Sequence, residues 1–212
     1  LEEGGLSGQL VFEAEHVDFN YGDTAVIKDF SVRVMRGDRI GIVGPNGAGK
    51  STLMKILAGY ESASGGELRI NGEPRRFDGS RAAEAEGIVL IHQEFNLADD
   101  LTVAQNIFLG HERKRGWLLD DEAMRREAAA VLRQVGLEIS ADTPVRQLIV
   151  AEKQLVEIAK ALSRRARLLI MDEPTATLTS GETERLFQLI AQLKADGVTV
   201  VYISHKLDEV ER

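Results

Sequence analysis

The sequence predicts an α/β fold with a core sheet of parallel strands, an antiparallel β portion near the N-terminus and an inserted helical subdomain. Three observations lead to this prediction. Short apolar, β-branched runs, typical of strands buried in a parallel sheet, occupy residues 39–43, 168–171 and 198–203. A glycine-rich octet separates the first run from a helical pattern. Residues 102–165 have a helical character.

Strand patterns dominate the N-terminal part of the chain. Residues 10–19 alternate between apolar and polar side chains, and residues 31–34 form a second short strand pattern. Further strands are predicted over residues 65–70 and 87–91, separated by an Asn-Gly turn signal and a proline. These segments make up the antiparallel β portion and contribute to the core sheet.

Helical patterns are clearest in four segments. Residues 50–58 and 122–135 are each followed by a glycine, which commonly ends a helix. Residues 152–164 carry apolar side chains on one face, and residues 182–195 are amphipathic. The last of these lies between two strand patterns, as expected for a helix that connects parallel strands.

The predicted domain organisation follows from these patterns. Residues 1–9 are rich in glycine and acidic residues and are expected to be a flexible tail. Residues 10–212 are expected to form one domain, with its core in 10–97 and 165–212 and its helical subdomain in 98–164.

Length, charge and cysteine content exclude several classes of protein. A chain of 212 residues buries roughly 70% of its unfolded surface without a disulfide or metal. The absence of cysteine removes thiolate zinc sites, iron–sulfur clusters and thiol catalysis. The net charge of 26 − 34 = −8 argues against a general nucleic-acid binder. No run of about 18 apolar residues occurs, so the cytoplasm is the default location, with docking onto a membrane protein still open.

The octet fits the G-x-x-x-x-G-K-[ST] pattern, lies between a strand and a helix, and is followed by Thr52. Its glycines let backbone N–H groups turn toward phosphate oxygens, and the helix N-terminus adds its dipole. The lysine would neutralise phosphate, and the serine hydroxyl would bind Mg²⁺. The residues of this loop are Gly44, Pro45, Asn46, Gly47, Ala48, Gly49, Lys50 and Ser51.

Two carboxylates follow the strand at 168–171 and support a nucleoside triphosphatase site. Asp172 can belong to the Mg²⁺ shell, and Glu173 can polarise a water for attack on the γ-phosphate. An Asp-Glu pair after a strand is usually only the start of a loop, but beside a phosphate loop it indicates catalysis.

Three further residues, in this order along the chain, complete a pattern that resembles the ATP-binding cassette (ABC) ATPase domain over about residues 10–212. The resemblance implies that Tyr21 stacks on adenine, that Gln93 contacts the metal or the attacking water, and that His205 contacts the γ-phosphate. It implies a P-loop fold of the ABC type, with ATP and Mg²⁺ as ligands. The implied catalytic residues are Glu173, His205, Gln93 and Lys50, the metal ligands are Ser51, Gln93 and Asp172, and the nucleotide contacts are Tyr21 and residues 44–52.

Residues 88–212 are similar to the ATPases of bacterial monosaccharide importers of the ribose, xylose and galactose type, in the segments HQEFNLADDLTVAQNIFLG, VEIAKALS and LLIMDEPTATLT. Because those importers usually carry two such domains in one chain, this would be the first. Residues 10–50 look closer to soluble tandem ABC ATPases that act at ribosomes, so a composite chain is a second interpretation.

The predicted function is the ATP-hydrolysing subunit of a monosaccharide importer. The alternatives are a non-transport ABC ATPase, acting at ribosomes or in regulation, and a nucleotide-binding but weakly active chain.

The resemblance also implies partners and a location. The first partner is a second ABC ATPase domain, either in the same chain or in the other chain of a dimer. The others are transmembrane permease subunits and, indirectly, a periplasmic sugar-binding protein. No nucleic acid is expected. The location would be cytoplasmic and peripheral on the inner face of the cell membrane. The chain ends at Arg212, seven residues after His205, where the family usually continues, so C-terminal truncation is expected.

The family's Leu-Ser-Gly-Gly-Gln signature is altered in this chain. Ile149 stands where the serine belongs, Ala151 replaces a glycine, and Glu152 replaces the glutamine. In the family, the serine and the neighbouring N–H groups bind the γ-phosphate held by the opposite domain. Isoleucine offers no hydroxyl, alanine restricts the backbone, and glutamate brings negative charge. Either a homodimer completes the partner's site poorly, or hydrolysis occurs at a composite site completed by a second domain.

Two weaker features remain in the helical region. The run Arg113-Lys114-Arg115 with Trp117 is either a nucleic-acid patch or a solvated turn, and the acidic chain favours the turn. The segment after Gln93 lies where the family's transporters insert a coupling helix and is expected to be a docking surface, although part of it is core. Its apolar residues are Phe95, Leu97, Leu101, Ile107 and Phe108.

Overall fold

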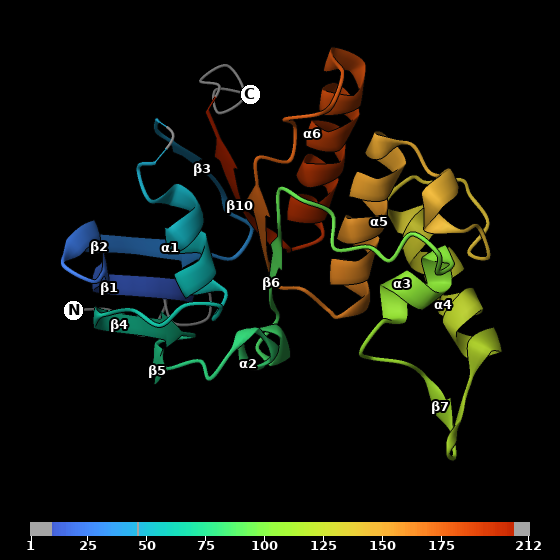
Figure 1. Ribbon diagram of the computed structural model, residues 1–212, viewed down its shortest axis with the longest axis horizontal. Helices are drawn as coiled ribbons and strands as arrows, with labels where there is room; N and C mark the ends of the chain where they lie inside the picture. Colours follow the sequence, from blue (N-terminus) through green and yellow to red (C-terminus); the bar gives the residue numbers. More distant parts are fainter. Residues whose placement is uncertain (1–9, 46, 206–212) are drawn as a thin grey trace.

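A computed structural model describes residues 10–45 and 47–205 and contains two four-stranded sheets and a small hairpin (Figure 1). The first sheet is antiparallel, with the order β2-β1-β4-β5; its strands are β1 (Leu10–Tyr21), β2 (Thr24–Met35), β4 (Gly65–Ile70) and β5 (Glu73–Arg75). The second is parallel, with the order β3-β10-β9-β6; its strands are β3 (Arg39–Val43), β10 (Thr199–Ser204), β9 (Leu168–Asp172) and β6 (Ile88–Ile91).

The register of the parallel sheet brings the carboxyl ends of its strands to one edge. Ser204 pairs with Val43, and Ile203 pairs with Asp172. Ile91 pairs with Met171, one residue before the end of β9. The loops that follow these four strands therefore start side by side, which is where ligands bind in open α/β sheets.

The parallel sheet forms the middle of three layers and is covered on both faces (Figure 1). One face, including Ile170 and Ile203, packs with α1 (Lys50–Leu57) and the antiparallel sheet. The other face, including Leu169 and Tyr202, packs with the remaining long helices. Burial on both faces explains why β6, β9 and β10 are continuously apolar rather than alternating. By contrast, β3 was expected to be buried but is an edge strand and only half-buried. The helices after α1 are α2 (Ser80–Ala85), α3 (Val103–Phe108), α4 (Asp121–Gln134), α5 (Val150–Ser163) and α6 (Ser180–Ala195), with a 3₁₀ turn at Val145–Gln147.

This architecture confirms the predicted α/β fold class and corrects several elements. The strand predicted at 31–34 is the end of the much longer β2, which starts at Thr24. The helices predicted from 152 and 182 begin at Val150 and Ser180. The short elements β5 and α2 escaped prediction: β5 has three residues and contains a proline, and α2 has six residues without an apolar stripe.

The region predicted to be helical also contains a β-hairpin, formed by β7 (Lys114–Arg115) and β8 (Leu118–Leu119). In the described part of the chain, no helix is long and apolar enough to cross a membrane. The tail predicted at 1–9 lies outside the described residues, as do Asn46 and residues 206–212. The division into a core and a helical subdomain remains a prediction.

Candidate functional site

The glycine-rich loop connects the end of β3 to the start of α1. Gly49 stands at the N-cap of α1 with a left-handed φ of 80°. A Cβ at this position would lie 2.9 Å from Cγ1 and 3.0 Å from the carbonyl oxygen of Val26 in β2. Only glycine allows this backbone angle together with this close approach to β2. The predicted loop residue Asn46 lies outside the described residues.

Lys50 is held against the inner side of this loop. Its side chain is buried, and Nζ donates hydrogen bonds to the carbonyl oxygens of Gly44 at 2.5 Å and Pro45 at 2.9 Å. The N–H of Ala48 donates to the Pro45 carbonyl at 3.2 Å and tightens the turn. Ser51 follows the lysine in the first turn of α1 and is exposed.

Tyr21 presents an exposed aromatic ring near the same loop. It ends β1, has 53% of its surface exposed, and contacts Phe19 edge-to-face with ring centroids 4.8 Å apart. Tyr21 pairs with Thr24, two residues before the Val26 that touches Gly49. The antiparallel sheet thus carries the predicted adenine-stacking residue toward the phosphate loop.

Asp172 and Glu173 lie at the end of β9, where the backbone changes direction. Glu173 has a left-handed φ of 49°, uncommon for a residue with a side chain, and its N–H donates to the Ile203 carbonyl oxygen at 3.1 Å. Its Oε2 atom is 3.4 Å from Nδ1 of His205. Such strain persists where the surroundings enforce it, and it clusters at functional sites. Two predicted catalytic residues are therefore in contact.

Gln93 follows β6 at the same sheet edge and is exposed to solvent. The strand order places β10, which leads to His205, between the strand of the phosphate loop and the strand of Asp172. The predicted residues from four separate segments thus gather at one edge of one sheet, although their catalytic and binding roles remain predictions.

The oxygen donors at this edge suit Mg²⁺ held together with phosphate. Ser51 offers a hydroxyl, Asp172 a carboxylate and Gln93 an amide oxygen, which are hard ligands. Among the described residues, no group of three or more His, Cys, Asp or Glu side chains could hold a metal. Mg²⁺ typically uses one or two carboxylates and substrate phosphates rather than a dedicated cage, so this donor set fits a nucleotide-bound ion.

Sequence reasoning missed a clamp formed by α5 on the segment after Gln93. The N–H of Asn96 donates to Oε1 of Glu157 at 2.7 Å, and Nζ of Lys160 donates to the Asn96 carbonyl oxygen at 2.9 Å. Both α5 side chains are buried. Burial lowers the pKa of Lys160, and the Glu157 carboxylate partly opposes that shift. A Glu and a Lys inside the apolar pattern of this helix were the available sequence signal.

A second missed residue, Asn106, fixes the next part of the same segment. It is fully buried, and its amide accepts from the N–H of Ala98 at 2.7 Å and donates to carbonyls of residues 98, 101 and 102. Beside it, Ile107 and Phe108 are buried in the core and present no docking surface. Their helical spacing is that of core residues. Phe95, Leu97 and Leu101 are half-buried, and a docking role for their part of the segment stays a prediction.

The altered signature forms the start of α5. Ile149 is its N-cap residue and is 60% exposed. The Ile149 N–H donates to Oε2 of Glu152 at 3.0 Å, so this carboxylate caps the helix. Ala151 lies in the first turn between them. The helix end that would meet a phosphate therefore already holds a negative charge.

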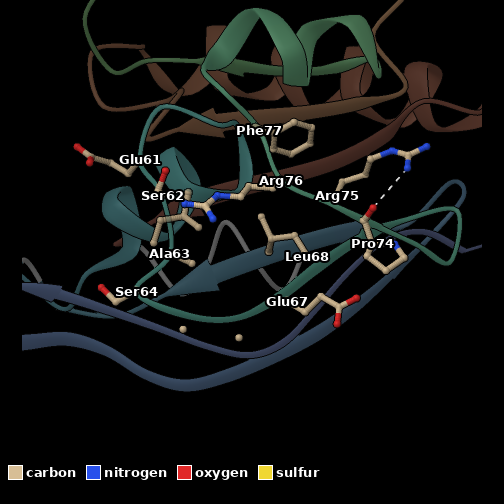
Figure 2. Close-up of a pocket in the computed structure, with 13 residues that line it drawn as sticks. Glu61, Ser62, Ala63, Ser64, Glu67, Leu68, Pro74, Arg75, Arg76 and Phe77 are labelled. Atoms are coloured by element: carbon tan, nitrogen blue, oxygen red, sulfur yellow. Dashed lines mark hydrogen bonds between the residues drawn. The ribbon is translucent and has the colours of Figure 1, made fainter.

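The cavity of about 540 Å³ in Figure 2 lies away from this edge. It is lined by Ile56 near the end of α1, by the loop that follows, and by residues of β4 and the β5 region. It contains both acidic and basic side chains, including Glu61, Glu67, Arg75 and Arg76. The C-terminal end of a helix repels phosphate, so this hollow is not the nucleotide site.

Comparison with known proteins decides the family. The sequence pattern described as "ABC transporter" matches residues 27–176, which is more than half of the chain. The chain belongs to the ABC transporter family. Among curated relatives of this cassette, a ribose import ATP-binding protein RbsA from Rhodopirellula baltica is 47% identical over 98% of the chain and 41% of the relative. A putative ribose/galactose/methyl galactoside import ATP-binding protein from Burkholderia ambifaria is 43% identical over 99% of the chain and 41% of the relative.

Solved ABC cassettes share the fold. The ADP conformation of MJ1267, an ATP-binding cassette of an ABC transporter, superposes with a TM-score of 0.84 at 27% identity, covering 95% of this chain and 83% of that one. The dimeric bacterial ABC transporter cassette MJ0796 superposes with a TM-score of 0.79 at 27% identity, covering 94% of this chain and 90% of MJ0796. The chain spans about 41% of the length of the first curated relatives. These comparisons confirm the predicted ABC-type fold and make the chain an ABC-type ATPase domain.

Proposed function

We propose that this cassette binds ATP with Mg²⁺ and hydrolyses it to power a membrane importer, with a monosaccharide as cargo. The observation that carries the proposal is the common sheet edge at which the phosphate loop, Asp172, Glu173, His205 and Gln93 lie. The names of the curated relatives, which are ribose and galactose import ATP-binding proteins, support the cargo.

The phosphate loop would hold the β- and γ-phosphates. Lys50 exchanges its bonds to the neutral Gly44 and Pro45 carbonyls for bonds to anionic phosphate oxygens, in which both partners are charged. Ser51 and Thr52 follow in the first turn of α1, whose N-terminus favours negative charge. Tyr21 offers its ring to adenine, since stacking requires only an exposed aromatic face.

Glu173 is the proposed general base. Its side chain is largely buried beside His205, and its backbone has a left-handed φ just after β9. The base would draw a proton from a water aligned with the γ-phosphate, and His205 would donate a hydrogen bond to that phosphate. Bound Mg²⁺, held by Ser51, Asp172 and Gln93, would neutralise charge that develops on the phosphates.

The proposed partners are a second ABC ATPase domain, transmembrane permease subunits and, through them, a periplasmic sugar-binding protein. The dimeric form of the similar cassette MJ0796 supports the first of these. The chain would then lie in the cytoplasm, peripheral on the inner face of the cell membrane. The altered start of α5 supports a weak homodimer site, or a composite site with an intact second domain.

Fractionation of cells that express the tagged chain tests this proposal against the ribosome-associated alternative, which the wording of residues 10–50 favours. We expect the chain in the membrane fraction with a permease, and ATP-dependent uptake of ribose, xylose or galactose by proteoliposomes made from that complex. Uptake should be lost in Lys50→Ala. Recovery of the chain with ribosomes, without a permease, would contradict the importer and support the alternative.

A further inference from the structure

The hairpin of β7 and β8 is an apolar and cationic projection that the proposed function does not use. Lys114 pairs with Leu119, and Arg115 pairs with Leu118, around a two-residue turn of Gly116 and Trp117. Gly116 has a φ of 69°, as a turn with glycine in its first central position requires. In Figure 1 the hairpin extends from the helical end of the molecule, on the opposite side from β1 and β2.

The tip of this hairpin exposes three large apolar side chains. Trp117 is 92% exposed, Leu118 59% and Leu119 55%. A single exposed leucine needs no explanation, but a tryptophan followed by two leucines makes this convex tip apolar at the turn and on both faces of the hairpin. Because side chains of paired residues lie on the same face of a ribbon, each face of the hairpin carries one cation beside one leucine.

The base of the hairpin is fixed while its tip is free. Arg113 forms an ion pair with Glu127 of α4 at 2.8 Å and lies over the ring of Phe108 in α3, 5.0 Å from its centroid. The Asp120 N–H donates to the Arg113 carbonyl at 2.8 Å and closes the base. The hairpin is thus held outward by α3 and α4.

The charge of the tip has the opposite sign to that of the chain. The net charge is −8, whereas Lys114 and Arg115 form no ion pair with any residue that the structure describes. The nearby Glu112 carboxylate accepts the Gly110 N–H at 2.9 Å, and Asp120 caps α4 by accepting from Ala123 at 2.9 Å. Glu112 also interacts electrostatically with Lys114, but neither cation is held in an ion pair with a described residue, so both can face an anionic partner.

We propose that this hairpin inserts its tip into the surface of an anionic lipid bilayer. Tryptophan and leucine with flanking lysine and arginine are the residues that lie at membrane interfaces. A bilayer accepts a convex apolar tip without a shaped pocket, and its negative surface attracts the two cations. One hairpin gives weak attachment, which becomes effective when another contact already holds the protein at the membrane.

The sequence supplies the probe for a direct test. Trp117 is the single tryptophan, so intrinsic fluorescence reports the hairpin tip alone, and the chain contains no cysteine. Glu122→Cys, at an exposed position in the first turn of α4, attaches the chain to a maleimide lipid through a flexible linker. The vesicles contain phosphatidylcholine with brominated acyl chains, with or without phosphatidylglycerol.

We expect a blue shift of Trp117 emission and quenching by bromine in the vesicles that contain phosphatidylglycerol. The double variant K114E/R115E should lower the equilibrium constant for insertion by about 30-fold or more, because each cation raises this constant about fivefold at an anionic surface. The double variant K28E/R36E makes the same change of −4 in net charge, on exposed residues in and just after β2, and should insert like the tethered parent. L118S/L119S should also reduce quenching.

Three results would overturn the proposal. They are absence of quenching in both kinds of vesicle, equal quenching in K114E/R115E and K28E/R36E, and a Trp117 signal that responds to single-stranded oligonucleotide or to detergent-solubilised permease but not to lipid. The measurement needs neither ATP nor transport, so its failure leaves the proposed ATPase function untouched, and the converse also holds.

Discussion

Single residues with unusual backbone angles shape the nucleotide edge. Gly49 has a left-handed φ that lets the phosphate loop touch β2, and Glu173 has a left-handed φ although it carries a side chain. The first was foreseeable from the glycine in the motif. The second was not, because the sequence gives no sign of a strained glutamate. The hydrogen bond from its N–H to Ile203 shows what holds it there.

Lys50 leads to a prediction about affinity. Lys50→Met keeps the length of the side chain but removes the ammonium that donates to the loop carbonyls. Losing a charge-assisted bond costs about 1.5–3 kcal/mol, so ATP should bind about 10- to 100-fold more weakly. Equilibrium binding of a fluorescent ATP analogue measures this change. Lys55→Met, in the last turn of the same helix, is the matched control and should bind normally. Equal affinity in both variants would contradict the assigned role.

The residues at the start of α5 lead to a prediction about turnover. Ile149→Ser with Ala151→Gly should raise the ATPase rate of the homodimer by up to about 100-fold, because it restores a phosphate-binding hydroxyl and backbone freedom. Adding Glu152→Gln should raise it further by removing the negative cap. Leu109→Ser, another exposed apolar residue, is the control. An unchanged rate would favour a site completed by a different second domain.

At the scale of elements, α5 links the altered signature to the segment that carries Gln93. The clamp of Glu157 and Lys160 on Asn96 lies within this helix, two turns after its start. Any displacement of α5 therefore moves the backbone three residues after Gln93. This connection supplies a physical path between the two predicted site regions.

The clamp leads to a prediction about stability. Glu157→Gln should lower the free energy of unfolding by about 1–3 kcal/mol, because it weakens a buried charged acceptor and leaves Lys160 less compensated. Urea unfolding measures the loss. Glu138→Gln, at an exposed position, should change little. Lys160→Met should cost less in the Glu157→Gln background than alone, and fully additive effects would contradict a shared clamp.

The capping box of α6 gives a prediction about pH. The Thr179 N–H and hydroxyl both donate to Glu182, and these bonds lower the pKa of Glu182. In the unfolded chain this carboxyl takes up a proton near its ordinary pKa of 4.5, but in the fold it does so only at lower pH. The stabilisation of the fold by the Glu182 carboxylate is therefore present above that ordinary pKa. It is lost as the pH falls through the lower pKa that Glu182 has in the folded protein.

The stability difference between the parent and Glu182→Gln should therefore shrink as the pH falls from about 7 to below about 4. Urea unfolding across this range measures it, with Glu138→Gln, at an exposed position, as the matched variant for comparison. A difference that stays constant over the range would show that the carboxylate charge does not stabilise α6.

The elements that the sequence predicted well are those with strong periodicity. The strands β6, β9 and β10 were found because burial on both faces makes them continuously apolar, and β3 and β4 have the predicted bounds. The hairpin within the helical region escaped because strands of two residues have no periodicity. The clamp on Asn96 escaped because it joins residues more than 60 positions apart through the backbone of a loop.

At the scale of the whole molecule, two hydrophobic clusters share the parallel sheet as their common wall. One cluster contains α1 and the antiparallel sheet, and the other contains α3 to α6. The loops at the carboxyl edge therefore extend from a scaffold that is packed on both sides. Rigid strands hold such loops at fixed relative positions, which a hydrolytic site needs.

The central claim is that this edge hydrolyses ATP with Glu173 as the base. The decisive measurement is phosphate release and ATP affinity for Glu173→Gln, made in the parent and in the I149S/A151G background. We predict that ATP affinity stays close to that of each parent while turnover falls by about 100-fold or more. The exposed carboxylate variant Glu94→Gln should keep its turnover. Turnover that survives Glu173→Gln unchanged would contradict the account.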